Sequence, residues 1–123
     1  MLNRPSTITH RQTLLREALA VMHAHYATDL TLDDVAHTIA TSRRQLQRCF
    51  AEHAGESYRT TLSRIRAAKA AELLRETDLP IAVVARRVGY AEPAQFAKAF
   101  RRHVGVVPSA YRRAHAGERL VPA

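Results

Sequence analysis

Several kinds of residue are scarce in this chain of 123 residues, and each scarcity excludes a class of protein. There is one cysteine, Cys49, so the chain cannot close a disulfide on itself, which favours a reducing cytoplasm. Four glycines and five prolines are too few for a turn-rich β-protein. No apolar run approaches the roughly 20 residues that cross a bilayer. The first residues also lack the apolar core of a secretory signal, so we expect a cytoplasmic protein.

What the chain has in abundance is helix-forming residues and positive charge. Hydrophobic residues make up 46% of it, enough for a modest core, and Ala, Leu, Arg and Glu favour helices. The formal net charge is +8. An excess of this size predicts an anionic partner, with nucleic acid first and a membrane surface second. Solubility alone is the remaining explanation for the charge.

Two stretches of the chain are nearly the same. TDLTLDDVAHTIATS begins at Thr28 and TDLPIAVVARRVGYA begins at Thr77, 49 positions later. One extra residue in the second turn then changes the offset to 50, which aligns Leu46 with Phe96 and Gly55 with Gly105. Each copy predicts a short helix, a tight turn, a second helix and a glycine stop, which is a helix-turn-helix.

The repeat predicts how the chain is organised. We expect a first helix-turn-helix subdomain at residues 10–57, a linker helix at 58–77 and a second helix-turn-helix subdomain at 78–115. Residues 1–9 and 116–123 are expected to be flexible tails. Thr9 is expected to cap the first helix, and Ala68 to lie in the apolar stripe of the linker helix. That helix, at about 20 residues, is ~30 Å long. One turn of DNA is ~34 Å, so one monomer can reach two successive major grooves of an asymmetric site.

The second helix of a helix-turn-helix enters the major groove, so its exposed residues are the candidate readers of bases. In the first copy this face carries Arg43, Arg44, Gln47 and Arg48. Arg pairs with guanine and Gln with adenine in bidentate fashion. The alternative is a solvated basic face.

The corresponding helix in the second copy has fewer long polar side chains. Gln95 and Lys98 can reach bases, whereas Ala94 and Ala97 offer only a small apolar surface. We expect this copy to contribute mainly phosphate contacts and positioning. The alternative is a purely structural repeat. Across the chain, the candidate phosphate ligands are Ser42, Arg43, Arg59, Arg66, Lys69, Arg101 and Arg112.

Two longer segments carry a resemblance to a known family. GYAEPAQFAKAFRRHVGVVPSAYRR, starting at Gly89, and VAHTIATSRRQLQRCFAEHAG, starting at Val35, resemble the DNA-binding domain of AraC/XylS transcription regulators over residues 10–113. The resemblance implies an all-α fold of seven helices, two of them for recognition, and a regulator acting on promoter DNA. The positions that contact bases in the family correspond to Arg44, Gln47, Arg48, Ala94, Gln95 and Lys98.

The resemblance also implies a mode of action. The chain is similar to short single-domain activators of the MarA/SoxS type, which bind as monomers and contact RNA polymerase. Such a protein is controlled by its amount rather than by a ligand and acts at the bacterial nucleoid. The alternative is the DNA-binding fragment of a longer, effector-responsive regulator.

Residues suited to other chemistries do not form a motif. The seven histidines include no HExxH pattern and the chain has no CxxC, so we expect neither a metal site nor a cofactor. Cys49 lies beside Phe50 on the apolar side of a helix, which predicts a small buried hydrophobe. No Ser-His-Asp arrangement is evident, so we expect no enzyme. A basic module that recruits RNA polymerase or packs DNA without sequence preference stays open.

Overall fold

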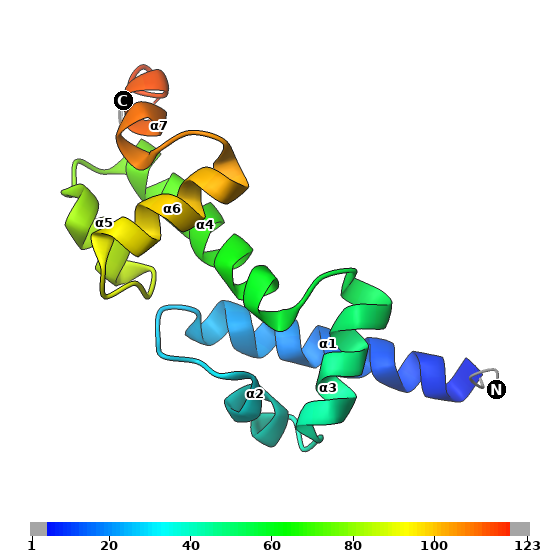
Figure 1. Ribbon diagram of the computed structural model, residues 1–123. Coiled ribbons are helices and arrows are strands. Elements are labelled where there is room, and N and C mark those ends of the chain that lie inside the picture. The colour runs from blue at the N-terminus through cyan, green and yellow to red at the C-terminus, as the bar shows by residue number, and fades with distance from the viewer. Residues whose placement is uncertain (1–4, 119–123) are drawn as a thin grey trace, which may run out of the picture. The chain divides into compact units, whose positions relative to one another are not determined.

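The structure is a computed structural model that describes residues 5–118, and all of its regular elements are helices (Figure 1). The elements in chain order are α1 (Pro5–His25), α2 (Leu32–Thr38), α3 (Arg43–Cys49), η1 (Phe50–Ala54), α4 (Tyr58–Glu76), α5 (Ile81–Arg87), α6 (Pro93–Val104) and α7 (Pro108–Ala114). The segment η1 is a π-helical turn that continues α3. The prediction of an all-α fold with seven helices is confirmed for the described residues.

The first helix begins earlier than expected. Because α1 starts at Pro5, residues 5–9 of the predicted tail are helical, and Thr9 lies inside the helix instead of capping it. The Thr9 carbonyl accepts a hydrogen bond from the Thr13 hydroxyl at 3.0 Å. Proline suits a first helical turn, where the backbone N–H has no partner in any case. At the other end, residues 116–118 of the predicted tail follow α7 outside any helix and are exposed, and the remaining tail residues, 1–4 and 119–123, lie outside the described part of the chain.

The chain folds into two compact units, and the boundary falls within α4. One unit extends to Leu62 and the other begins at Ser63. The first turn of α4 therefore belongs to the first unit and the rest of the helix to the second. The helix that we expected to act as a linker is part of both cores.

The core of the first unit joins α1, α2, α3 and η1. Its fully buried side chains are Ala18, Met22, Val35, Leu46, Cys49 and Phe50. Phe50 meets Tyr58 edge to face, with 5.8 Å between ring centroids. The Tyr58 hydroxyl donates to the Leu30 carbonyl at 2.8 Å, which fixes the loop before α2 to the start of α4. This packing holds α3 in place.

The core of the second unit is built on the later turns of α4. Its fully buried side chains are Ala70, Leu74, Val84, Ala85, Val88, Phe96 and Phe100. The expectation for Ala68 was wrong, because this residue is exposed. It shares a row of the helix, at spacings of four residues, with the exposed Arg64 and Glu72. Ala67 and Ala70 are buried beside it.

The backbone reproduces the repeat in both turns. The Thr41 N–H donates to the Ala36 carbonyl, and the Tyr90 N–H donates to the Ala85 carbonyl, each at 2.9 Å. The two donors are 49 positions apart in the sequence, and so are the two acceptors. The left-handed turn residue is Ala40 in the first copy, with φ 56°, and a glycine in the second. An L-residue in this conformation costs about 1–2 kcal/mol, which glycine avoids.

Candidate nucleic-acid interface

The face of α3 brings three of the predicted reading residues together. Ser42 caps the helix, and its hydroxyl accepts a hydrogen bond from the Gln45 N–H at 3.0 Å. Leu46 and Cys49 are fully buried, so the helix turns the residues between them outward. Arg44, Gln47 and Arg48 are all exposed, at spacings of three and four residues. Side chains at these spacings share one helix face, which makes a polar, hydrogen-bonding surface.

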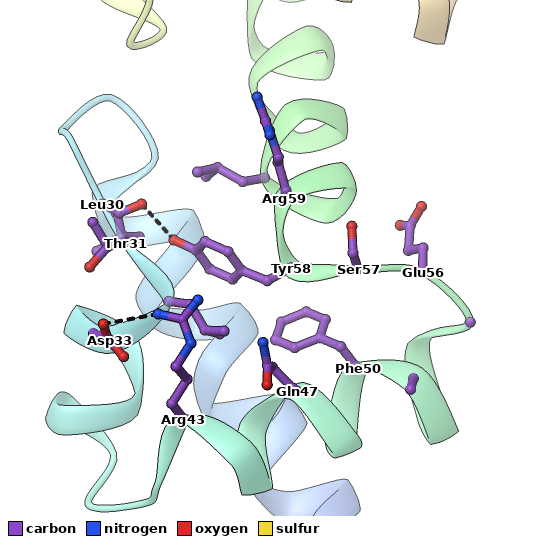
Figure 2. Close-up of a pocket in the computed structure, with 14 residues that line it drawn as sticks. Leu30, Thr31, Asp33, Arg43, Gln47, Phe50, Glu56, Ser57, Tyr58 and Arg59 are labelled. Carbon is purple, nitrogen blue, oxygen red and sulfur yellow. Dashed lines mark hydrogen bonds and ion pairs between the residues drawn. The ribbon is translucent and has the colours of Figure 1, made fainter.

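Arg43 differs from its neighbours because its charge is already paired. Its Nη1 donates to Oδ2 of Asp33, in the first turn of α2, at 3.0 Å (Figure 2). No described residue forms an ion pair or hydrogen bond with the side chain of Arg44. The two adjacent arginines therefore begin α3 in different electrostatic states.

The face of α6 is less polar. Ala94, Gln95 and Lys98 are exposed, while Phe96 and Phe100 are buried beneath them. Pro93 occupies the first turn, and Glu92 before it makes no side-chain capping bond. Two long polar side chains on this face, Gln95 and Lys98, have hydrogen-bonding groups for DNA. The structure therefore places the six predicted base-contacting residues on two exposed helix faces, one in each unit.

The remaining phosphate candidates have different surroundings. Arg59 and Arg101 are exposed. The guanidinium of Arg66 lies over the Tyr90 ring, 5.3 Å from its centroid, and the Lys69 amine is 4.0 Å from a Glu72 carboxylate oxygen. These two side chains are half-buried and interact within the protein.

Arg112 is held most firmly inside the fold. Its Nε donates to the Leu74 carbonyl at 3.2 Å, and its Nη2 is buried. A guanidinium near the last carbonyls of α4 compensates the negative end of that helix. The contact joins α7 to α4, which is a structural role. The sequence could not show it, because the two residues are 38 positions apart.

Charge is distributed unevenly between the two units. The residues up to Leu62 include seven Lys and Arg against six Asp and Glu, and those from Ser63 include twelve against five. The exposed cations of the second unit include Arg86, Arg87 and Arg102, which are not among the candidates predicted from the sequence. In the sequence they belong to two Arg-Arg pairs, Arg86-Arg87 at the end of α5 and Arg101-Arg102 near the end of α6.

A groove of about 990 Å³ borders the face of α3 in the first unit (Figure 2). Leu30, Leu32 and Leu62 contribute apolar walls, together with the rings of Phe50 and Tyr58. Arg43 and Gln47 also line it, so the groove and the reading face share Gln47. The sequence does not predict this groove, because its walls come from separate segments.

Among the described residues of the first unit, two ionisable groups have shifted pKa values. Hydrogen bonds from the Thr31 backbone N–H and hydroxyl to Asp34 hold the pKa of that carboxyl below its usual range. The bond from the Thr31 N–H is one half of a capping box at the start of α2, and in the other half the Thr31 hydroxyl accepts from the Asp34 N–H at 3.1 Å. Burial raises the pKa of the Cys49 thiol, which keeps it protonated. The prediction that Cys49 is a small buried residue is confirmed.

Known proteins resemble this chain in sequence. A helix-turn-helix domain model matches residues 35–114. The regulatory protein PocR of Salmonella typhimurium is 34% identical over 104 residues, which are 85% of this chain and 34% of PocR. The lactose operon transcription activator of Staphylococcus xylosus is 32% identical over 80% of this chain and 35% of its own length. The chain thus spans about a third of the curated relatives it matches.

Solved structures agree with that match. An AraC-type DNA-binding domain-containing regulator from Chromobacterium violaceum has a TM-score of 0.82 and 28% identity, over 89% of this chain and 97% of that one. The DNA-binding domain of AdpA, solved in complex with a target DNA, has a TM-score of 0.78 and 30% identity, over 85% and 95%. Among residues 5–118, no helix is long and apolar enough to cross a membrane. The chain belongs to the AraC/XylS family of transcription regulators and has the helix-turn-helix DNA-binding domain of that family.

Proposed function

We propose that the chain binds double-stranded promoter DNA at a preferred sequence and regulates transcription. The observation that carries this proposal is the exposed Arg44, Gln47 and Arg48 on one face of a helix whose opposite face is fully buried. Arg and Gln are the side chains that read guanine and adenine in the major groove. A relative of the same fold is solved with its target DNA, which supports DNA as the partner.

In this proposal the two exposed helix faces have different tasks. Arg44, Gln47 and Arg48 of α3 discriminate bases, and Ala94, Gln95 and Lys98 of α6 contact a second groove. Phosphates are held by Ser42, Arg59, Arg66, Lys69 and Arg101, and Arg43 is a further candidate whose guanidinium already pairs with Asp33. Arg112 leaves this set because it binds the Leu74 carbonyl.

We further propose that one monomer reads an asymmetric site through two successive major grooves. The shared helix α4 has 19 residues and is therefore ~28 Å long. That length is comparable to the ~34 Å of one DNA turn. The DNA site need not be palindromic, because the two reading helices differ.

The regulatory outcome we propose is activation through contact with RNA polymerase at the bacterial nucleoid, without enzymatic chemistry. The similarity to a lactose operon activator supports activation. The curated relatives are about three times as long as the matching segment. This supports a second form of the proposal, in which the chain is the DNA-binding part of a longer, effector-responsive regulator.

Selection of bound duplexes from a random pool at physiological salt tests the proposal. We expect an asymmetric motif of two blocks about one turn apart, with the stronger block opposite α3. The variant Arg44→Ala/Gln47→Ala should lose the stronger block and keep the weaker one. A pool that shows no enrichment with the unchanged chain would refute sequence-dependent binding.

The charge of the second unit favours one other function, a basic module that holds DNA without sequence preference. Twelve cations against five anions supply the phosphate attraction that dominates such binding. In that case the selection gives no motif, and substitutions on α3 weaken all duplexes equally.

A further inference from the structure

The ion pair between Asp33 and Arg43 occurs in the first unit and has no equivalent in the second. It joins the first turn of α2 to the first residue of α3, at 3.0 Å. Both side chains stay well exposed, with 58% of Arg43 and 65% of Asp33 accessible. At the repeat offsets of 49 and 50, the corresponding residues are Ala82 and Pro93. The pair is therefore not a requirement of the helix-turn-helix scaffold.

This ion pair contributes little to holding the fold together. Exposed ion pairs are weakly stabilising at best. The two helices are already joined by buried side chains, with Val35 of α2 and Leu46 of α3 both fully buried. What the pair does fix is the position of a charge. Arg43 lies at the positive end of the α3 dipole, where a cation is disfavoured, and the Asp33 carboxylate offsets that cost.

The pair also lies beside the proposed reading face, where it affects the approach of phosphates. Arg44 and Arg48 are on that face, and Arg43 begins the same helix. A carboxylate at this place repels phosphates and occupies a guanidinium that would otherwise attract them. Binding to DNA of arbitrary sequence depends almost entirely on phosphate attraction. The Asp33 carboxylate therefore weakens this binding more than binding to a preferred sequence.

We propose that Asp33 is a specificity-determining residue, whose carboxylate withholds Arg43 from phosphates and so weakens non-cognate binding more than cognate binding. In the cognate complex, base contacts fix the position of α3, so releasing Arg43 adds little. In a non-cognate complex the docking is loose, and a released Arg43 can take any phosphate within reach. The inference rests on the proposed function.

The test measures binding of the full chain to its selected duplex and to a scrambled duplex across a range of salt concentrations. With Asp33→Asn, we expect the non-cognate affinity to rise on the order of fivefold, and the cognate affinity to rise less. The salt slope on scrambled DNA should steepen by about 0.9, the value for one added phosphate contact. Adding Arg43→Gln to this variant should return the slope to its original value, and Asp33→Glu should behave as the unchanged chain.

Glu17→Gln is the matched control, because it removes the same charge from an exposed position on α1. The inference is overturned if Asp33→Asn and Glu17→Gln change both affinities and the slope by the same amounts. Thermal unfolding verifies that each variant is folded before binding is compared. The selection with the unchanged chain separates the two proposals: without a motif both fall, whereas a motif with no effect of Asp33→Asn overturns only the role of Asp33.

Discussion

The two helix-turn-helix units keep the same interior and differ at their surfaces. Five pairs of equivalent positions are buried in both copies: Val35 and Val84, Ala36 and Ala85, Leu46 and Phe96, Cys49 and Ala99, and Phe50 and Phe100. Packing of two helices across a tight turn tolerates few side-chain volumes, so these positions stay small or apolar. The comparison shows which part of the repeat is scaffold.

The helix starts of the two units are built from different chemistry. In the first unit, Thr31 forms a capping box with Asp34, and Ser42 caps α3. In the second unit, Pro80 and Glu92 precede the helices without side-chain capping bonds, and Pro93 sets the backbone of α6. The first unit therefore begins its helices with side-chain hydrogen bonds, where the second unit has proline. The polar capping residues of the first unit lie close to the proposed reading face.

The charges differ as well, and this difference suggests separate tasks. The first unit is close to neutral, with seven cations against six anions, while the second has twelve against five. Phosphate attraction follows net charge, whereas base discrimination follows placed hydrogen-bonding groups. We therefore infer that the first unit mainly specifies the site and the second mainly holds the DNA backbone.

The largest expected effect tests whether the two cores are equivalent. Phe50→Ala and Phe100→Ala each remove a fully buried ring, which should lower the free energy of unfolding of the affected unit by about 3–5 kcal/mol. Urea denaturation followed by circular dichroism measures this change. A loss below about 1 kcal/mol for only one of them would show that the cores are not equivalent.

The next effect separates specification from holding. Arg48→Ala should cost about 1–3 kcal/mol on the selected duplex and little on scrambled DNA. Arg101→Ala should weaken both duplexes and reduce the salt slope by about 0.9. Fluorescence anisotropy titrations at several salt concentrations measure both variants. If Arg101→Ala were the more sequence-dependent of the two, the assigned tasks would have to be exchanged.

A smaller effect concerns the capping box of α2, which α5, α6 and α7 of the second unit lack. Thr31→Ala should lower the free energy of unfolding by about 1 kcal/mol. Folding lowers the pKa of the Asp34 carboxyl, so this carboxylate stabilises the folded state. Its contribution to the free energy of unfolding is complete above the ordinary pKa of 3.8 and is lost as pH falls through the lower pKa of the folded state. Unfolding of the Asp34→Asn variant below pH 4 should be correspondingly less dependent on pH. An unchanged pH profile in that variant would contradict this account.

The smallest effect exchanges the turn residues. Ala40→Gly removes the strain of a left-handed alanine and adds backbone entropy to the unfolded chain, leaving a net gain of about 0.5 kcal/mol. Gly89→Ala, at φ 103°, should instead destabilise the second unit by about 1 kcal/mol or more. Thermal unfolding compares the two variants. Equal effects of the same sign would show that the two turns are not equivalent.

Much of the fold follows from local patterns in the sequence. Apolar residues at helical spacing predict the helices, and the matched spacing of Leu46 and Phe50 with Phe96 and Phe100 predicts the second helix of each unit. The start of α1 at Pro5 and the exposure of Ala68 were missed. Several neighbouring alanines fit an apolar stripe equally well, and only the packing partner selects among them.

The sequence by itself determined the repeat, the helices and the outward face of α3, because these depend on periodicity and on residues a few positions apart. Only the tertiary structure decided which cations already have a partner. Arg43 meets Asp33 ten positions away, and Arg112 meets Leu74 across 38. Such pairs form because packing brings distant segments together. The order of charges along the chain does not show which segments will meet.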